Sequence, residues 1–181
     1  MSTFNAILEQ ATRSVSSEYF QIQVMGKPAP IFRERVYCYE LYHQLRSNWG
    51  SFNSNYKLCG EVDKSGHPIL RNTRQSPDFL VHVPGEDCNM VVIEVKPAKF
   101  NKRGLIKDLQ TIHKLMGSEG NYERGICLIY GNKRNLIRSI EKAVNESNIS
   151  AINIEIWHHP TVGERARHIE VLGTKPPQPN L

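Results

Sequence analysis

Asp78, Glu94 and Lys96 are ionisable residues set into the apolar runs between Ser76 and Lys96. Successive side chains of a strand alternate between its two faces, so Glu94 and Lys96 share one face. Fifteen residues separate Asp78 from Glu94, and the segment P-G-E-D-C-N between them is long enough to join two strands as a hairpin. Such a hairpin brings two carboxylates and an ammonium group to one end of a sheet.

Two carboxylates that converge in a buried place repel each other, and a divalent cation removes this penalty. Mg²⁺ takes oxygen ligands, keeps several waters and is commonly held by one or two carboxylates together with substrate phosphate. The metal supplies a hydroxide-like nucleophile and stabilises charge on a phosphoryl oxygen. A neighbouring lysine orients the water and offsets the charge of the transition state. The pattern therefore predicts Mg²⁺-dependent phosphodiester hydrolysis, with Mn²⁺ as a substitute.

The hydrophobic periodicity predicts the elements that must position these groups. An order of antiparallel strands, a crossover helix and a further strand is typical of a mixed α/β sheet with helices on its faces. The helix at about residues 31–46 has a core stripe of Tyr37, Leu41 and Leu45. The other predicted helices are 3–18, 105–116 and 135–145, and the predicted strands are 56–62, 67–71, 78–83, 90–96, 125–130 and a segment around 152–156.

The length of 181 residues predicts one α/β domain over residues 1–173, with a helical extension at 1–27. The Pro-rich tail, residues 174–181, is expected to be disordered. No apolar run approaches the roughly 20 residues of a membrane span, so we expect a soluble, cytoplasmic protein with no membrane partner. The four cysteines lack a C-x-x-C pair and are interpreted as reduced thiols rather than zinc ligands. The pair His158-His159 is expected at a strand end on the surface.

The net charge of +5 favours an anionic partner, and its distribution is more informative than its size. The segment from Lys96 to Lys114 contains six basic residues against the single acid Asp108, and thus also sums to +5. A run of this kind commonly forms a solvated helix face. Because it begins at the hairpin with the two carboxylates, we interpret it as a track for nucleic-acid phosphates.

The pattern Pro77-Asp78 followed by Glu94-Val95-Lys96 resembles the PD-(D/E)XK nuclease superfamily, which includes many restriction endonucleases. The core of that superfamily is a helix, three antiparallel strands, a helix and another strand, and this order fits the predictions for about residues 31–131. The resemblance implies a restriction-endonuclease-like fold. It also implies that Asp78, Glu94 and the backbone carbonyl of Val95 ligate the metal, while Lys96 acts on the attacking water.

Members of the superfamily often add an acidic residue from the first core helix, and Glu40 fits that place. Glu61, on the first predicted strand, is the alternative, and the sequence does not decide between them. The helix after the motif often contributes polar or basic groups. With the basic run, this makes the predicted nucleic-acid-binding residues Lys99, Lys102, Arg103, Lys107 and Gln110.

The sequence thus predicts a metal-dependent nuclease, with DNA favoured over RNA as substrate. Cutting both strands of a duplex would favour a homodimer, because each subunit has one site. One alternative is an inactive module with the nuclease fold that binds nucleic acid or a partner protein. Another is an unrelated α/β protein with a basic surface, in which Asp78 and Glu94 lie far apart.

Overall fold

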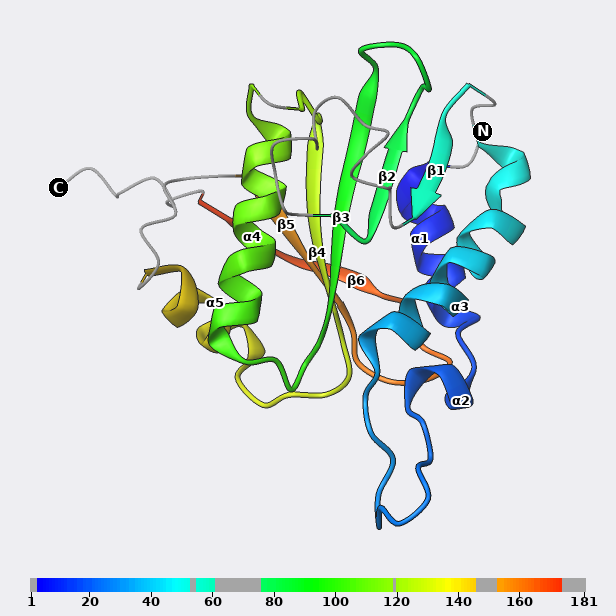
Figure 1. Cartoon of the computed structure of the whole chain (residues 1–181), viewed down its shortest axis with the longest axis vertical. Helices are drawn as coiled ribbons and strands as arrows, with labels where there is room; N and C mark the ends of the chain where they lie inside the picture. Colours follow the sequence, from blue (N-terminus) through cyan, green and yellow to red (C-terminus); the bar gives the residue numbers. More distant parts are fainter. Residues whose placement is uncertain (1–2, 53–54, 61–75, 119, 146–152, 174–181) are drawn as a thin grey trace, which may run out of the picture.

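A six-stranded mixed sheet, with strand order β1-β2-β3-β4-β5-β6, forms the centre of the protein (Figure 1). The computed structural model describes residues 3–52, 55–60, 76–118, 120–145 and 153–173. Strands β1 to β3 pair antiparallel, β3 to β5 pair parallel, and β6 is antiparallel to β5. The strands are β1 (Lys57–Gly60), β2 (Phe79–His82), β3 (Asn89–Pro97), β4 (Arg124–Tyr130), β5 (Ile154–His159) and β6 (Arg167–Leu172).

Helices cover both faces of this sheet, which gives the three-layer arrangement expected for a mixed α/β fold (Figure 1). Helices α1, α2 and α3 lie on one side, while α4 and α5 lie on the other. Helix α4 is the crossover that makes β3 and β4 parallel. The helices are α1 (Phe4–Arg13), α2 (Ser17–Phe20), α3 (Glu34–Ser47), α4 (Lys102–Met116) and α5 (Leu136–Asn145), with a 3₁₀ turn at Trp49–Ser51.

Strand β3 is buried on both faces because it lies between two hydrophobic cores. Val91, Ile93 and Val95 pack into the core beneath α1 and α3. The alternate residue Val92 packs into the core beneath α4 and α5. Glu94 follows Val92 on the same face of the strand. The carboxylate of Glu94 is therefore carried by a strand that is buried on both faces.

The prediction of a mixed α/β fold is confirmed. The N-terminal region differs in two ways from what was predicted for that region. The helix predicted at 3–18 ends at Arg13, and a separate short helix, α2, begins at Ser17. Ser14, Ser16 and Ser17 lie around the break, where hydroxyls compete with helical backbone bonds. Helix α1 packs into the same core as α3 rather than forming an appended extension.

Strand β6 was not predicted, and three other predictions cannot be placed. The side chains of β6 are exposed or half-buried along most of its length, so the strand lacks a clear alternating pattern. The predicted strand at 67–71, Glu61 and the tail at 174–181 lie outside the described residues. Of the helices in the described part of the chain, none has both the length and the apolar character that crossing a membrane requires.

His159 is fully buried, so the prediction of a surface position for it was wrong. Its Nδ1 lies 2.8 Å from the hydroxyl of Tyr37 on α3. Its ring packs edge-on against Phe20, with ring centroids 5.0 Å apart. Burial lowers the pKa of His159 to about 4, so the imidazole is neutral at pH 7. The prediction failed because helices α2 and α3 cover the end of β5.

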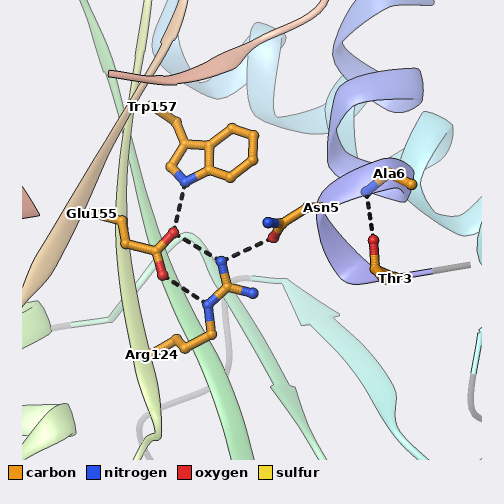
Figure 2. Close-up of polar contacts among 6 residues, drawn as sticks. All are labelled: Thr3, Asn5, Ala6, Arg124, Glu155 and Trp157. Carbon is orange, nitrogen blue, oxygen red and sulfur yellow. Dashed lines mark hydrogen bonds and ion pairs between the residues drawn. The ribbon is translucent and has the colours of Figure 1, made fainter. Parts of the chain in front are cut away.

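A polar network ties helix α1 to the parallel strands (Figure 2). Arg124 donates two hydrogen bonds to the carboxylate of Glu155, each 2.8 Å long. The same carboxylate accepts a 2.9 Å hydrogen bond from the indole of Trp157. Arg124 also donates to the side-chain oxygen of Asn5 at 2.9 Å. The paired guanidinium and carboxylate therefore join β4 and β5 to the start of α1.

Candidate active site

Five charged residues from four segments of the chain form a cluster at the end of β3. Figure 1 shows that β3 leads into the loop before α4 and that α3 begins at the same end of the sheet. Glu34 belongs to the first turn of α3, and Asp108 to the second turn of α4. Asp78 directly precedes β2, while Glu94 and Lys96 belong to β3. We call the four acids, Glu34, Asp78, Glu94 and Asp108, the acidic cluster, and Lys96 is its lysine.

Asp78 is held in place by the backbone of the neighbouring strand. The register pairs Phe79 of β2 with Ile93 of β3, so Asp78 lies beside Glu94 and Val95. The backbone N–H of Val95 donates a 2.7 Å hydrogen bond to Oδ2 of Asp78. Burial raises the pKa of Asp78 to about 7, although this hydrogen bond opposes the rise. The hydrogen bond thus fixes the position of the Asp78 carboxylate, while burial makes its charged form costly.

Glu94 is only 6% exposed and shares this unfavourable environment. Burial raises the pKa of Glu94 well above its usual range. The carboxylates of Asp78 and Asp108 raise it further, and a hydrogen bond with the Asp78 side chain acts in the same direction, while Lys96 opposes the rise. The structure therefore brings Asp78 and Glu94 together, as the hairpin interpretation required.

Lys96 is clamped between two helices. Its Nζ lies 2.8 Å from Oε2 of Glu34 and 2.8 Å from Oδ2 of Asp108. Burial lowers the pKa of Lys96, but the hydrogen bonds to Asp108 and Glu34 outweigh this effect and raise it above its usual range. Lys96 is accordingly a permanent cation in this arrangement. We call Glu34, Lys96 and Asp108 the lysine clamp.

Sequence reasoning missed both carboxylates of the lysine clamp. Glu40, the predicted acid of α3, accepts a 2.7 Å hydrogen bond from Gln44 on the same helix. Glu40 follows Glu34 by six positions, which places the two side chains about 120° apart around the helix axis. Glu34 is thus the acid of α3 that reaches Lys96. Asp108 could have been identified from the sequence, because this acid falls within the apolar stripe of Leu105, Leu109 and Ile112.

The predicted basic residues lie on the outer face of α4 and in the loop before it. Lys99, Lys102, Arg103, Lys107 and Gln110 are all exposed. A hollow of ≈ 470 Å³ on this face is lined by Asn101, Arg103, Gly104, Ile106, Lys107 and Gln110. The ammonium of Lys107 lowers the pKa of Asp108, an acid whose pKa burial raises overall. The basic face therefore adjoins the lysine clamp.

Two cysteine thiols next to the cluster are poor nucleophiles. Burial raises the pKa of Cys38 well above its usual value, and the carboxylates of Asp78 and Glu34 raise it further. Burial likewise raises the pKa of Cys127, which pairs with Glu94 in the register of β3 and β4. Only the thiolate attacks readily, so these side chains do not support covalent catalysis.

The donor set of the site fits a hard divalent cation that keeps much of its hydration. Within the described ranges, no group of three or more His, Cys, Asp or Glu side chains is arranged to hold a metal ion. Asp78, which is half-buried, and Glu94, which is buried, nevertheless offer two adjacent carboxylates whose pKa values burial raises. Mg²⁺ needs only one or two carboxylates when water and substrate phosphate complete its shell. A cation of this kind would offset the repulsion between the two acids.

Comparison with known proteins leaves the site to be interpreted from its own geometry. The sequence matches no protein-family model and no curated protein. The chemistry therefore has to be inferred from the acidic cluster, its lysine and the basic face of α4.

Proposed function

We propose that this protein is a metal-dependent nuclease that hydrolyses phosphodiester bonds, with DNA favoured over RNA. The observation that carries the proposal is the adjacent pair of carboxylates, the half-buried Asp78 and the buried Glu94, with Lys96 on the same strand as Glu94. The order α3, β1, β2, β3, α4, β4 supports a restriction-endonuclease-like core, because it is the order that the PD-(D/E)XK resemblance implies.

Each residue of the site has a distinct task in this proposal. Asp78 and Glu94 hold the divalent cation, which supplies the nucleophilic water and neutralises charge on the phosphate when it is bound. The N–H of Val95 orients the carboxylate of Asp78 through its 2.7 Å hydrogen bond. The backbone carbonyl of Val95 remains the predicted third metal ligand. Lys96 offsets the extra negative charge of the transition state.

The permanent positive charge of Lys96 limits the roles that this residue can have in the reaction. Because the hydrogen bonds to Asp108 and Glu34 hold its pKa above the usual range, Lys96 does not accept a proton from water at neutral pH. It instead orients the water and the phosphate as a fixed cation. An arginine at this position would keep the charge, whereas a methionine would remove it. Lys96→Arg is therefore expected to retain more activity than Lys96→Met.

The substrate is proposed to cross the basic face of α4. Arg103 and Lys107 line the hollow on the outer face of α4, and both are exposed to an incoming phosphate. Lysine and arginine side chains that neutralise phosphates supply affinity that does not depend on sequence and that weakens with salt. The face thus suits a nucleic-acid backbone. A homodimer would place two such sites on a duplex.

Cleavage of supercoiled plasmid and of labelled single- and double-stranded oligonucleotides tests the proposal. We expect cleavage with Mg²⁺ or Mn²⁺, none with a chelator, and none from Asp78→Asn or Glu94→Gln. The matched control is Glu141→Gln, an exposed acid of α5. Cleavage that survives in both Asp78→Asn and Glu94→Gln would contradict the assignment.

A second candidate function is an inactive module of the same fold that binds nucleic acid. The observation that favours it is that, in the described part of the chain, no three potential ligands converge on a metal. This candidate predicts binding to oligonucleotides that depends on Arg103 and Lys107, without turnover under either metal. The binding and cleavage assays on one preparation separate the two candidates.

A further inference from the structure

The ammonium of Lys96 is shared by two carboxylates that come from opposite sides of the sheet. Glu34 reaches it from the start of α3, and Asp108 reaches it from the second turn of α4, each at 2.8 Å. The side chains of Lys96 and Asp108 are only 15% and 11% exposed. The contact to Asp108 is therefore largely shielded from water.

Asp108 occupies a position where packing alone would favour an apolar residue. It lies in the stripe of α4 that faces the sheet, together with Leu105, Leu109 and Ile112. Burial raises the pKa of Asp108, so the position makes the charged form costly. Buried ion pairs add little net stability compared with well-packed apolar residues of similar volume. The stability of α4 thus gives no sufficient reason for an acid at this place.

The two contacts restrict the geometry of the ammonium group. Glu34 and Asp108 each place a carboxylate oxygen 2.8 Å from the ammonium, so the end of this long side chain is held from two directions. Glu94 precedes Lys96 by two positions and shares its face of β3, so the side chain of Lys96 leaves the strand on the face that carries the Glu94 carboxylate.

We propose that Asp108 is a positioning residue that, together with Glu34, fixes Lys96 so that its ammonium serves the reacting phosphate or its attacking water. This inference rests on the proposed nuclease function and deepens it. Asp108 itself touches neither metal nor substrate. It acts through Lys96, whose ammonium lies 2.8 Å from its carboxylate.

The first test is kinetic. Asp108→Asn keeps the size of the side chain but removes the charge that holds Lys96. A small displacement of a reacting group costs up to ~100-fold in rate. We expect kcat to fall about 10- to 100-fold, with KM for the oligonucleotide within about 2-fold of wild type, because the variant leaves Arg103 and Lys107 in place. Glu141→Gln is the matched control and is expected to change neither parameter.

The second test needs no enzymatic activity. Brief acylation with an amine-reactive acetyl ester, read by peptide mass spectrometry, reports how freely each lysine reacts. In the wild type, Lys96 of β3 is expected to react at least 10-fold more slowly than the exposed Lys114 of α4. In Asp108→Asn, the reaction of Lys96 is expected to accelerate several-fold while that of Lys114 stays the same.

The two tests separate the possible failures. Faster acylation of Lys96 together with a reduced kcat supports the inference. Wild-type kcat in Asp108→Asn, or unchanged acylation of Lys96, overturns it. A wild-type protein that cleaves no substrate overturns the nuclease proposal, and this inference about the reaction falls with it, whereas acylation still reports on the clamp. If Asp108→Asn does not fold, Glu34→Gln removes the other partner and is judged by the same two measurements.

Discussion

Replacing Asp78 with asparagine is predicted to stabilise the protein while abolishing its activity. Burial raises the pKa of Asp78 from 3.8 to about 7. In the unfolded chain the carboxyl ionises near pH 4, whereas in the folded protein it ionises near pH 7. Between these values the folded state binds more protons than the unfolded state, so stability falls as the pH rises. Above pH 7 the full penalty is present.

The size of this penalty follows from the rise in pKa. At about 1.4 kcal/mol for each tenfold change, a rise from 3.8 to about 7 corresponds to on the order of 4 kcal/mol. Asparagine removes the charge but accepts a weaker hydrogen bond from the N–H of Val95, which offsets part of the gain. We therefore expect Asp78→Asn to be more stable at pH 8 by about 2 kcal/mol, or roughly 4–8 °C in Tm.

Urea denaturation followed by tryptophan fluorescence measures this effect, because Trp49 and Trp157 are both buried in the core beneath α1 and α3. The wild type should lose stability from pH 4 to pH 7, and Asp78→Asn should lose less. Asp87→Asn, at an exposed acid of the loop between β2 and β3, is the matched control. A variant less stable than wild type at pH 8, or a flat wild-type profile, would refute the reasoning.

Three further predictions concern the metal, the core and the basic face. Because burial raises the pKa of Asp78 to about 7 and also raises that of Glu94, Mg²⁺ has to displace a proton in weakly acidic solution. Calorimetric titration should therefore show tighter binding at pH 8 than at pH 6, and pH-independent binding would count against the site. Tyr37→Phe removes the 2.8 Å contact to buried His159 and should cost about 1–3 kcal/mol in urea denaturation, whereas no loss would indicate that the imidazole finds another partner. Lys107→Ala should weaken oligonucleotide binding for all sequences and reduce the slope of log K against log salt by about 1, and an unchanged slope would exclude a phosphate contact.

Local periodicity was sufficient to predict the parts of the site that belong to one strand or one hairpin. Glu94 and Lys96 share a face because strand side chains alternate. Asp78 meets them because the two strands are antiparallel neighbours in register. These relations depend on spacing along a short segment. These relations could therefore be predicted from the sequence.

The lysine clamp could not be predicted in the same way, because it depends on the orientation in which two helices pack against the sheet. Glu40 was selected because the family resemblance implies an acid on the first core helix, but the docking of α3 turns Glu34 toward Lys96 instead. Asp108 was counted only as a minority acid in a basic run, although its place in an apolar stripe was visible. Strand β6 was not predicted because an edge strand with few buried side chains has weak hydrophobic periodicity.

The dispersed origin of the acidic cluster has a consequence during protein synthesis. Lys96 needs Glu34 from 62 positions earlier and Asp108 from 12 positions later. A chain still emerging from the ribosome cannot form the clamp until α4 has left the exit tunnel and the two layers have closed on the sheet. Any property that depends on the clamp is thereby absent from nascent and truncated chains until both helix layers are in place.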